Sequence, residues 1–574
     1  MARLVITNRG DVFDRVVDRW RASGLEWTRI PGTLFVAAAR KRRIVHRNTS
    51  VADERSWVVG TGTYATWDGR WEDAALDVVA SRFDRDDPSR VRDEVLGHYA
   101  LAVRRDDRVA VMCDEVCSAE LFLTERDGDF VVATALGDVS VVDWIDEPID
   151  VDGALLAAFH GHRGIAGRSA VHGVAAIRGH QFVDLRETPA GWTSRLVDGP
   201  PVALRPAPSS EAAAVEEYTA ATERLVAALA TGPDYGVNVT GGLDSRLVAA
   251  AAHRFGSPSR LLYGAGNSAM TNTRRQDLTA ARSLSAHLDV PLTILDWRQD
   301  RPWTAVERAA LRDRFGFSLP YGATAGVMAE MAAAGPAATI PPLQLGGYSP
   351  GFTNKKVWEW TEAVDAVEFA RRWAAPYLGV LRSATDRHRY LERMAGDLES
   401  LADQLGVARH DGRFGVADAM VVFGFAYVSK DAFNTVAFNE WAFALAPHMT
   451  SDLLLRVLSV PPEWRRGDRF QLALIRALDP EVLSIPVFSG TRPFRAADDG
   501  GLVAVDPRRD WTVHERATEK VRDLARSGAL RTRRFRRTLL DDLRPLVGDA
   551  IDPERLVDQD LRAVFRFVVA REVI

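Results

Sequence analysis

The sequence predicts an α/β protein with a β-rich N-terminal part and a C-terminal part built on a doubly wound parallel sheet with many helices. Three observations lead to this prediction. The chain has 574 residues, which is too long for one hydrophobic core. Short strand-like runs separated by turn residues fill residues 2–140. After residue 210, strand-like and helix-like segments alternate, which is typical of a parallel sheet.

The N-terminal part is predicted to form layers of short strands with a few helices. Strand-like runs occupy residues 3–7, 33–39, 57–62, 99–104, 108–114, 119–124 and 129–135. The pair Asp127–Gly128 between two of these runs is a typical hairpin turn. Residues 151–160 predict a short helix, and residues 179–186 with 191–197 predict a closing hairpin.

Residues 198–210 are rich in proline, serine and alanine, which predicts an interdomain linker. A long helix is expected directly after it, at residues 211–230. The alternating elements that follow are strands at 235–239, 259–266 and 291–297, and helices from about Arg246 and at 275–288. The rest of the chain is predicted to be mostly helical, including residues 452–460, 470–478 and 560–573.

Composition argues against several classes of protein. The net charge of -5 is mild, whereas a nucleic-acid binder usually carries a basic excess. Cys113 and Cys117 are too few for a disulfide framework, and no Cys/His set has the spacing of a zinc site. The N-terminus lacks the apolar core of a signal peptide, and no run of about 18 apolar residues is present. We therefore expect a cytoplasmic enzyme or binding protein that contacts neither nucleic acid nor membrane.

The stretch "VNVTGGLDSR" at residues 237–246 has the outline of a phosphate site between a strand and a helix. Its glycines allow positive φ and a close approach of the backbone, and the helix start offers unpaired N–H groups. The hydroxyls of Thr240 and Ser245 can donate to phosphate oxygens. Asp244 is an anion, so it suits the site only through Mg²⁺. Gly-Lys-Ser/Thr is missing, so this is not the P-loop of kinases. The competing interpretation is a glycine-rich tight turn.

The segment "TGGLDSR" at residues 240–246 resembles the pyrophosphate-binding loop of N-type ATP pyrophosphatases, which split ATP into AMP and pyrophosphate to activate a carboxylate. Residues 97–139 and 171–185 are similar to segments of the glutaminase domain in the asparagine synthetase family. The resemblance implies a glutaminase-like αββα layer domain at residues 1–205. It also implies a synthetase-like ATP-binding domain at residues 206–574.

The same resemblance implies which residues bind ATP and Mg²⁺. Asp244 would hold the metal, and the strand around Leu262 would meet the adenine. The full implied nucleotide set is Val239, Thr240, Gly241, Gly242, Asp244, Ser245, Leu262, Tyr263, Gly264, Gly346 and Gly347.

The sequence departs from the family's pattern at the glutaminase nucleophile. Glutamine-dependent members expose a cysteine as the first residue of the mature chain, whereas the second residue here is Ala2. A methyl group cannot attack an amide, and Cys113 and Cys117 are internal. We expect no ammonia from glutamine, and a role as scaffold or partner surface for this domain. The pattern matches two branches that make an amide within one substrate, the lasso peptide cyclases and the β-lactam synthetases.

Two further departures concern charged groups. Family members place an acidic second metal ligand where this chain has Tyr348 and Ser349. Lys355 and Lys356 follow closely, and they either touch phosphates or lie in a solvated loop. The region matching the family's catalytic lysine, residues 479–494, contains no lysine.

Arg492 is the nearest cation in that region and could stabilise developing negative charge, although its pKa is too high for proton donation. Glu440 and His448, in a segment that resembles the family's acceptor site, are candidate acid/base groups. For Arg492 the alternative is a structural ion pair, and for Glu440 and His448 it is a satisfied polar side chain.

Two basic runs, residues 40–43 and 531–537, are each either a solvated face or a docking patch for an acidic peptide or partner protein.

Together these observations predict an AMP-forming amide synthetase that uses ATP and Mg²⁺. The expected substrate is a ribosomal precursor peptide, which makes the protein a macrolactam-forming lasso peptide cyclase that works with a leader peptidase or leader-binding protein. One alternative is a β-lactam-synthetase-like ligase of a small amine/carboxylate substrate. The other is a non-catalytic binding module of the same fold, favoured by the missing acidic residue and lysine and opposed by the intact loop.

Overall fold

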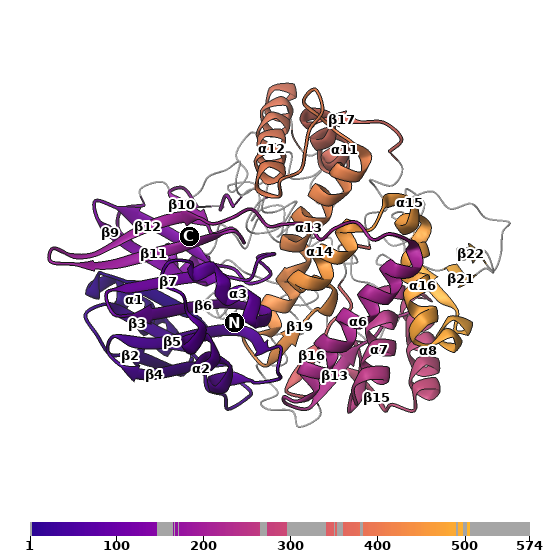
Figure 1. Cartoon of the computed structure of the whole chain (residues 1–574), viewed down its shortest axis with the longest axis horizontal. Coiled ribbons are helices and arrows are strands. Elements are labelled where there is room, and N and C mark those ends of the chain that lie inside the picture. Colours follow the sequence, from indigo (N-terminus) through magenta and orange to yellow (C-terminus); the bar gives the residue numbers. More distant parts are fainter. Residues whose placement is uncertain are drawn as a thin grey trace, which may run out of the picture.

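The computed structural model shows two connected α/β halves (Figure 1). It describes residues 3–145, 165, 167–169, 171–264, 272–295, 340–348, 351–352, 360–378, 381, 383–489, 492–496 and 502–504. The last strand of the N-terminal half stops at Asp198, and the C-terminal half begins with a helix at Glu211. The predicted boundary at residue 205 lies in the coil between them.

Two antiparallel six-stranded sheets form the centre of the N-terminal half. The first sheet contains, in spatial order, β10 (Val174–Ala176), β8 (Phe122–Arg126), β9 (Asp129–Ala133), β1 (Leu4–Thr7), β3 (Phe35–Ala39) and β2 (Trp27–Ile30). The second contains β12 (Gly191–Asp198), β11 (Gln181–Thr188), β7 (Arg108–Cys113), β6 (Val95–Arg105), β5 (Ser56–Thr66) and β4 (Thr49–Asp53). The hairpins β8–β9 and β11–β12 confirm the two predicted turns.

The two sheets stack face to face, and helices cover their outer faces. Helix α1 (Gly10–Ala22) packs on β1 and β3, while α2 (Glu72–Arg82) packs on β4, β5 and β6. Apolar side chains from both sheets fill the space between them, among them Ile6, Val36, Trp57, Val111 and Leu185. Short helical turns complete this half: η1 (Pro88–Arg90), α3 (Val91–Glu94) and α4 (Leu136–Val139). The predicted αββα layers are confirmed, whereas the helix predicted at residues 151–160 lies outside the described residues.

A five-stranded parallel sheet forms the centre of the C-terminal half. Its order is β15 (Leu292–Leu295), β14 (Arg260–Gly264), β13 (Tyr235–Asn238), β16 (Leu343–Leu345) and β19 (Phe443–Leu445). From β13 the chain adds β14 and β15 on one side, and β16 and β19 then add on the other side. The direction of strand addition therefore reverses between β13 and β16. This arrangement confirms the predicted parallel, doubly wound class.

Helices and two small sheets complete the C-terminal half (Figure 1). The helices are α6 (Glu211–Ala230), α7 (Leu243–Phe255), α8 (Asn272–Leu288), α11 (Ala366–Leu378), α12 (Ala384–Gln404), α13 (Val416–Phe438), α14 (Ser451–Ser459), α15 (Pro462–Arg465) and α16 (Arg469–Leu478). The 3-10 turns are η2 (Pro447–Met449), η3 (Arg466–Asp468) and η4 (Pro480–Ser484). The small sheets pair β17 (Val364–Asp365) with β18 (Arg413–Phe414), and β20 (Val487–Ser489) with β21 (Arg492–Ala496) and β22 (Leu502–Ala504). Within the described residues, no helix combines the length and apolar character needed to cross a membrane.

Two details of the C-terminal half differ from the sequence prediction. Helix α7 begins at Leu243 and not near Arg246, because the extended backbone of Gly242 already serves as its N-cap. Asp244 and Ser245 therefore lie in the first helical turn. Strands β16 and β19 were not predicted, since each has only three residues and shows no period. The predicted helix at residues 560–573 and the basic run at 531–537 lie outside the described residues.

The basic run at residues 40–43 joins the two halves of the molecule. The backbone N–H groups of Arg42 and Arg43 donate to the carbonyls of Glu440 and Trp441, at 3.0 and 2.9 Å. Lys41 is buried, and its Nζ donates to the backbone and side-chain oxygens of Asn439 at 2.8 and 3.0 Å. We call residues 41–43 and 439–441 the interdomain joint. The predicted roles of this run, solvated face or docking patch, are wrong for Lys41 and Arg42, because their side chains are already used inside the molecule, whereas Arg40 is exposed.

Candidate functional site

Two glycine pairs lie at the carboxyl ends of the two central parallel strands. Gly241 and Gly242 follow β13, and Gly346 and Gly347 follow β16. Strand order reverses between β13 and β16, and open α/β sheets bind their ligands outside the strand ends at such a reversal. The segments that carry the two pairs also touch: a Cβ built on Gly347 would lie 2.5 Å from Ser245 Cα and 2.6 Å from its backbone N. The structure therefore brings the two predicted glycine segments together.

The glycine loop, residues 240–245, is held by short hydrogen bonds. Thr240 N donates to Ser245 Oγ at 2.9 Å, and the two hydroxyl oxygens lie 3.0 Å apart. Gly242 N donates to Thr240 Oγ1 at 3.2 Å. Gly241 N donates to Oδ1 of Asp277, on helix α8, at 3.1 Å. The loop amides thus face oxygen acceptors, which is the chemistry that phosphate oxygens would supply.

Gly242 of the loop does not adopt an unusual backbone conformation. Gly242 has φ -80° and ψ 169°, an extended conformation that any residue adopts. The expected positive φ is therefore wrong at this residue. A Cβ on Gly242 would meet only Thr240 Oγ1, at 3.4 Å, so packing within the chain does not demand a glycine there. Without a side chain, the backbone of Gly242 stays accessible to a close approach.

Asp244 lies in the first turn of α7, partly exposed, beside the loop. Its Oδ1 accepts a hydrogen bond of 2.6 Å from Nε2 of Gln471, a buried residue of α16. This bond fixes the carboxylate while leaving it acceptor capacity. Proteins usually hold Mg²⁺ through one or two carboxylates, with phosphate oxygens and water as further ligands. Among the residues that the structure describes, no three His, Cys, Asp or Glu side chains converge, so the phosphates would supply much of the coordination. The donor set fits a magnesium–polyphosphate group.

The tight contact between Gly347 and Ser245 gives a first prediction. We expect Gly347→Ala to destabilise the protein by about 1–3 kcal/mol, because the added methyl group forces α7 and the strand end apart. The displaced loop should also bind pyrophosphate about tenfold or more weakly. Urea unfolding and calorimetric titration measure the two effects. The matched control is Gly396→Ala at an exposed position of α12, where a Cβ meets nothing within 4 Å and about 0.5–1 kcal/mol of stability is gained. If the two variants changed stability and pyrophosphate binding equally, the tight contact between Gly347 and Ser245 would be contradicted.

The end of β14 lies beside the loop, as predicted, but its side chains point into the core. Val239 N donates to the carbonyl of Leu262 at 2.9 Å. Val239, Leu262 and Tyr263 are all buried, whereas Gly264 is exposed. Any contact between this strand and a nucleotide would therefore come from the backbone near Gly264.

The predicted acid/base residue Glu440 lies in the interdomain joint and not at the loop. It is 1% exposed and pairs with Arg42 at 3.0 Å and Arg3 at 3.6 Å. Burial alone would raise its pKa, but nearby positive charges, among them Arg3 and Arg42, outweigh burial and leave the pKa lowered. A carboxylate held in this way is a structural ion-pair partner, which corrects its assignment as an acid/base group.

The predicted acid/base residue His448 is also a buried structural group. Its Nδ1 lies 2.8 Å from the hydroxyl of Tyr218, and its ring contacts those of Tyr218 and Phe352. Burial lowers its pKa to about 3, so the imidazole is neutral. Arg492 begins strand β21, opposite Ser489, and its side chain lies outside the described residues, as do Ser349, Lys355 and Lys356. Tyr348 follows Gly347 and packs against the core.

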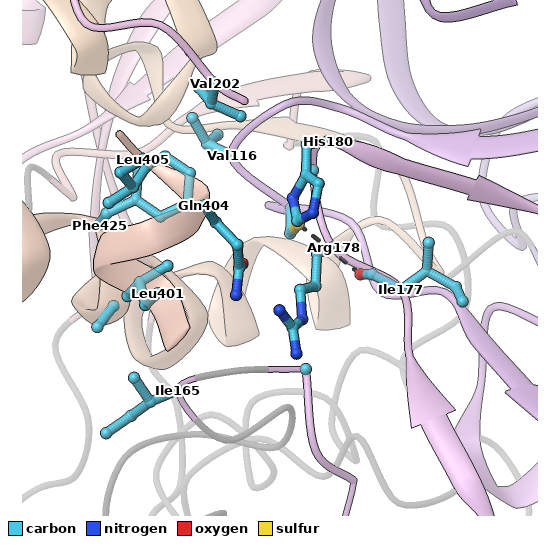
Figure 2. A pocket seen from close by; sticks show the side chains of 14 residues that line it. Val116, Ile165, Ile177, Arg178, His180, Val202, Leu401, Gln404, Leu405 and Phe425 are labelled. Atoms are coloured by element: carbon cyan, nitrogen blue, oxygen red, sulfur yellow. Dashed lines mark hydrogen bonds between the residues drawn. The ribbon is translucent and has the colours of Figure 1, made fainter. Parts of the chain in front are cut away.

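A hollow lies between the two halves of the molecule (Figure 2). Leu401, Leu405 and Phe425 line one side, and Val116, Ile177 and His180 line the other, with Arg178 and Gln404 between them. It shares no residue with the glycine loop.

The two cysteines of the chain lie at this hollow, one of them in its lining. Cys117 lines it, and Cys113 and Cys117 point their thiols toward the carbonyl of Ile177, with Sγ–O distances of 4.0 and 3.8 Å. A hydrogen bond to Cys117 and burial raise the pKa of Cys113, so this thiol is protonated and a poor nucleophile.

Sequence reasoning missed two residues that touch the loop. Asp277 lies 36 positions from Gly241, and Gln471 lies 227 positions from Asp244. An aspartate early in the helix after the second strand was a usable signal for Asp277. The sequence around Gln471 carries no such signal, because the contact is created by the packing of α16 on α7.

Comparison with known proteins adds little to this description. No protein-family model matches the chain, and no curated protein matches its sequence. Among solved structures, the allosteric regulatory enzyme of purine biosynthesis is similar over 53% of this chain and 82% of its own, with a TM-score of 0.24 and 10% identity. Glutamine phosphoribosylpyrophosphate amidotransferase from B. subtilis, complexed with ADP and GMP, is similar over 62% and 77%, with a TM-score of 0.23 and 9% identity. Similarities this low carry no argument about function.

Proposed function

We propose that this protein is an ATP-dependent, AMP-forming carbon–nitrogen ligase. It would adenylate a carboxylate and let an amine of the same substrate displace AMP. The observation that carries the proposal is the contact between the glycine loop, residues 240–245, and Gly347 at the strand-order reversal, where the loop amides face oxygen acceptors. The resemblance of residues 240–246 to the loop of N-type ATP pyrophosphatases supplies the reaction type.

The loop residues have distinct roles in this reaction. The amides of Gly241 and Gly242 and the hydroxyls of Thr240 and Ser245 would hold the two phosphates that leave as pyrophosphate, at the positive end of the α7 dipole. Asp244 would hold Mg²⁺, which when bound neutralises charge on the leaving group. A substrate carboxylate oxygen bonds to the α-phosphorus while the bond from that phosphorus to the bridging oxygen breaks. The amine then bonds to the acyl carbon, AMP leaves, and one proton is released.

The proposed substrate is a ribosomal precursor peptide, and the proposed activity is that of a macrolactam-forming lasso peptide cyclase. This choice rests on the resemblance to the asparagine synthetase family together with the burial of both cysteines, of which Cys113 is protonated and a poor nucleophile. The nitrogen would then come from the peptide's own N-terminal amine, with an internal Asp or Glu as the acyl donor. A leader peptidase or leader-binding protein is the expected partner.

The nucleotide product tests the proposal. The protein is incubated with ATP, Mg²⁺ and peptides that carry a free N-terminal amine and an internal Asp or Glu. We expect AMP and pyrophosphate in amounts equal to a peptide product lighter by one water. The control peptide has an acetylated N-terminus, which should abolish the cyclic product. Formation of ADP and phosphate instead of AMP would defeat the assignment. Turnover of small amine/carboxylate compounds alone would favour a β-lactam-synthetase-like ligase. If no substrate led to pyrophosphate release, the protein would be a non-catalytic binding module.

A further inference from the structure

The acceptors that face the loop amides are not chemically equivalent. Thr240 N and Gly242 N donate to neutral hydroxyl oxygens within the loop itself. Gly241 N donates to a carboxylate, Oδ1 of Asp277, which belongs to a different helix. Helix α8 holds this carboxylate at the loop through buried Leu278, Ala281 and Leu284, and α8 packs beside α7. One negative charge therefore already lies at the amide that a phosphate oxygen would use.

A phosphate cannot share this amide with Asp277. The N–H has one hydrogen, and two anions at hydrogen-bond distance from it would repel each other strongly in a partly buried site. The polyphosphate must displace the carboxylate, and the displaced carboxylate then still lies next to the phosphate because its helix is anchored. This arrangement weakens the binding of a polyphosphate that carries no metal ion. A cation bound to the phosphates removes the penalty, since the carboxylate then faces positive charge.

We propose that Asp277 is the specificity-determining residue that makes anion binding at the glycine loop depend on Mg²⁺, by occupying the Gly241 amide and rejecting metal-free polyphosphate. The inference rests on the proposed function, because it assigns the regulation of the same phosphate site. Asp277 is a positioning residue in this scheme. The ligand class that it selects is a magnesium-complexed polyphosphate, and the class that it excludes is the free anion.

The test measures binding of pyrophosphate by calorimetry, once with excess Mg²⁺ and once with a chelator. The parent protein should prefer magnesium pyrophosphate to free pyrophosphate by about a hundredfold. Asp277→Asn keeps the shape and an oxygen acceptor for Gly241 N but removes the charge. We expect this variant to bind free pyrophosphate about tenfold more tightly than the parent, and its preference for the magnesium complex to shrink by about tenfold or more.

The matched control is Asp289→Asn, the same change just beyond the other end of α8. Asp289 is exposed with φ 51°, a conformation that asparagine also tolerates, so both variants should fold and melt like the parent. The control should keep the parent's preference. If the parent binds pyrophosphate and Asp277→Asn behaves like Asp289→Asn, the inference about Asp277 is wrong and the proposed function stands. If the parent binds pyrophosphate under neither condition, the proposed function fails with it.

Discussion

Asp244→Asn should lower the rate of pyrophosphate release by about two to four orders of magnitude. The substitution removes the anionic ligand proposed for Mg²⁺, and metal-assisted charge stabilisation is worth several kcal/mol at about 1.4 kcal/mol per tenfold in rate. Tyr348 and Ser349 stand where the resemblance implies a second acidic ligand, so the loss should fall toward the larger end. The fold should survive, because the side-chain oxygen of asparagine can still accept from Gln471. The measurement is pyrophosphate release at saturating Mg²⁺, with circular dichroism to confirm folding.

The matched control for this variant is Asp11→Asn. Asp11 lies in the first turn of α1, which has 13 residues like α7, but it belongs to the outer layer of the N-terminal half. Its surface pairs with Arg9 and Arg15 contribute little, so turnover should stay within about twofold. A folded Asp244→Asn protein with activity within about threefold of the parent would mean that Asp244 only shapes the start of α7.

Glu440→Ala should lower the free energy of unfolding by about 3–5 kcal/mol. The variant takes Glu440 away from the guanidinium groups of Arg42 and Arg3, of which Arg3 keeps Asp138 at 3.3 Å, and removing one partner of a buried ion pair has this cost. Urea unfolding at neutral pH measures it. Because folding lowers the pKa of Glu440, its contribution is present above the ordinary carboxyl pKa and is lost as the pH falls through the folded value.

Glu368→Ala is the control for the size of this effect. Glu368 pairs with Arg372 at 2.8 Å on the surface of α11, and exposed pairs of this kind contribute at most about 1 kcal/mol. The variant Glu440→Gln separates structure from catalysis, since it keeps the side-chain volume. A stable Glu440→Gln protein that loses turnover more than about a hundredfold would restore Glu440 as an acid/base group and overturn its structural assignment.

Local patterns in the sequence predicted the local parts of the fold. The helix at α6 begins where Ser210 caps Ala213 N at 3.1 Å, and the hairpin turn at Asp127–Gly128 forms as its residues require. The strand–loop–helix unit around residues 237–246 was predictable for the same reason, because its glycines and its apolar strand are neighbours in the chain. Within this unit, the start of α7 was predicted incorrectly, because Gly242 already serves as the N-cap.

The unpredicted parts depend on contacts between distant residues. Strands β16 and β19 are too short for a period, and they exist because they extend a sheet begun by β13. Lys41 looks like a surface residue in sequence. In the fold it is buried, and its Nζ donates to Asn439, which lies 398 positions away in the chain. Glu440 and His448 were predicted as candidate acid/base groups because the sequence shows which functional groups a residue carries. It does not show which residues will contact those groups in the fold.

The contacts between the two halves of the molecule constrain how the gene can evolve. Strand β19 is the edge of the parallel sheet, and its Ala444 N donates to Thr63 Oγ1 of the N-terminal half at 2.9 Å. An unprotected sheet edge is a template for aggregation. A lineage that discarded the first half would expose this edge and the unpaired charge of Glu440 together. Selection for solubility alone would therefore keep both halves in one reading frame, whatever chemistry the first half performs.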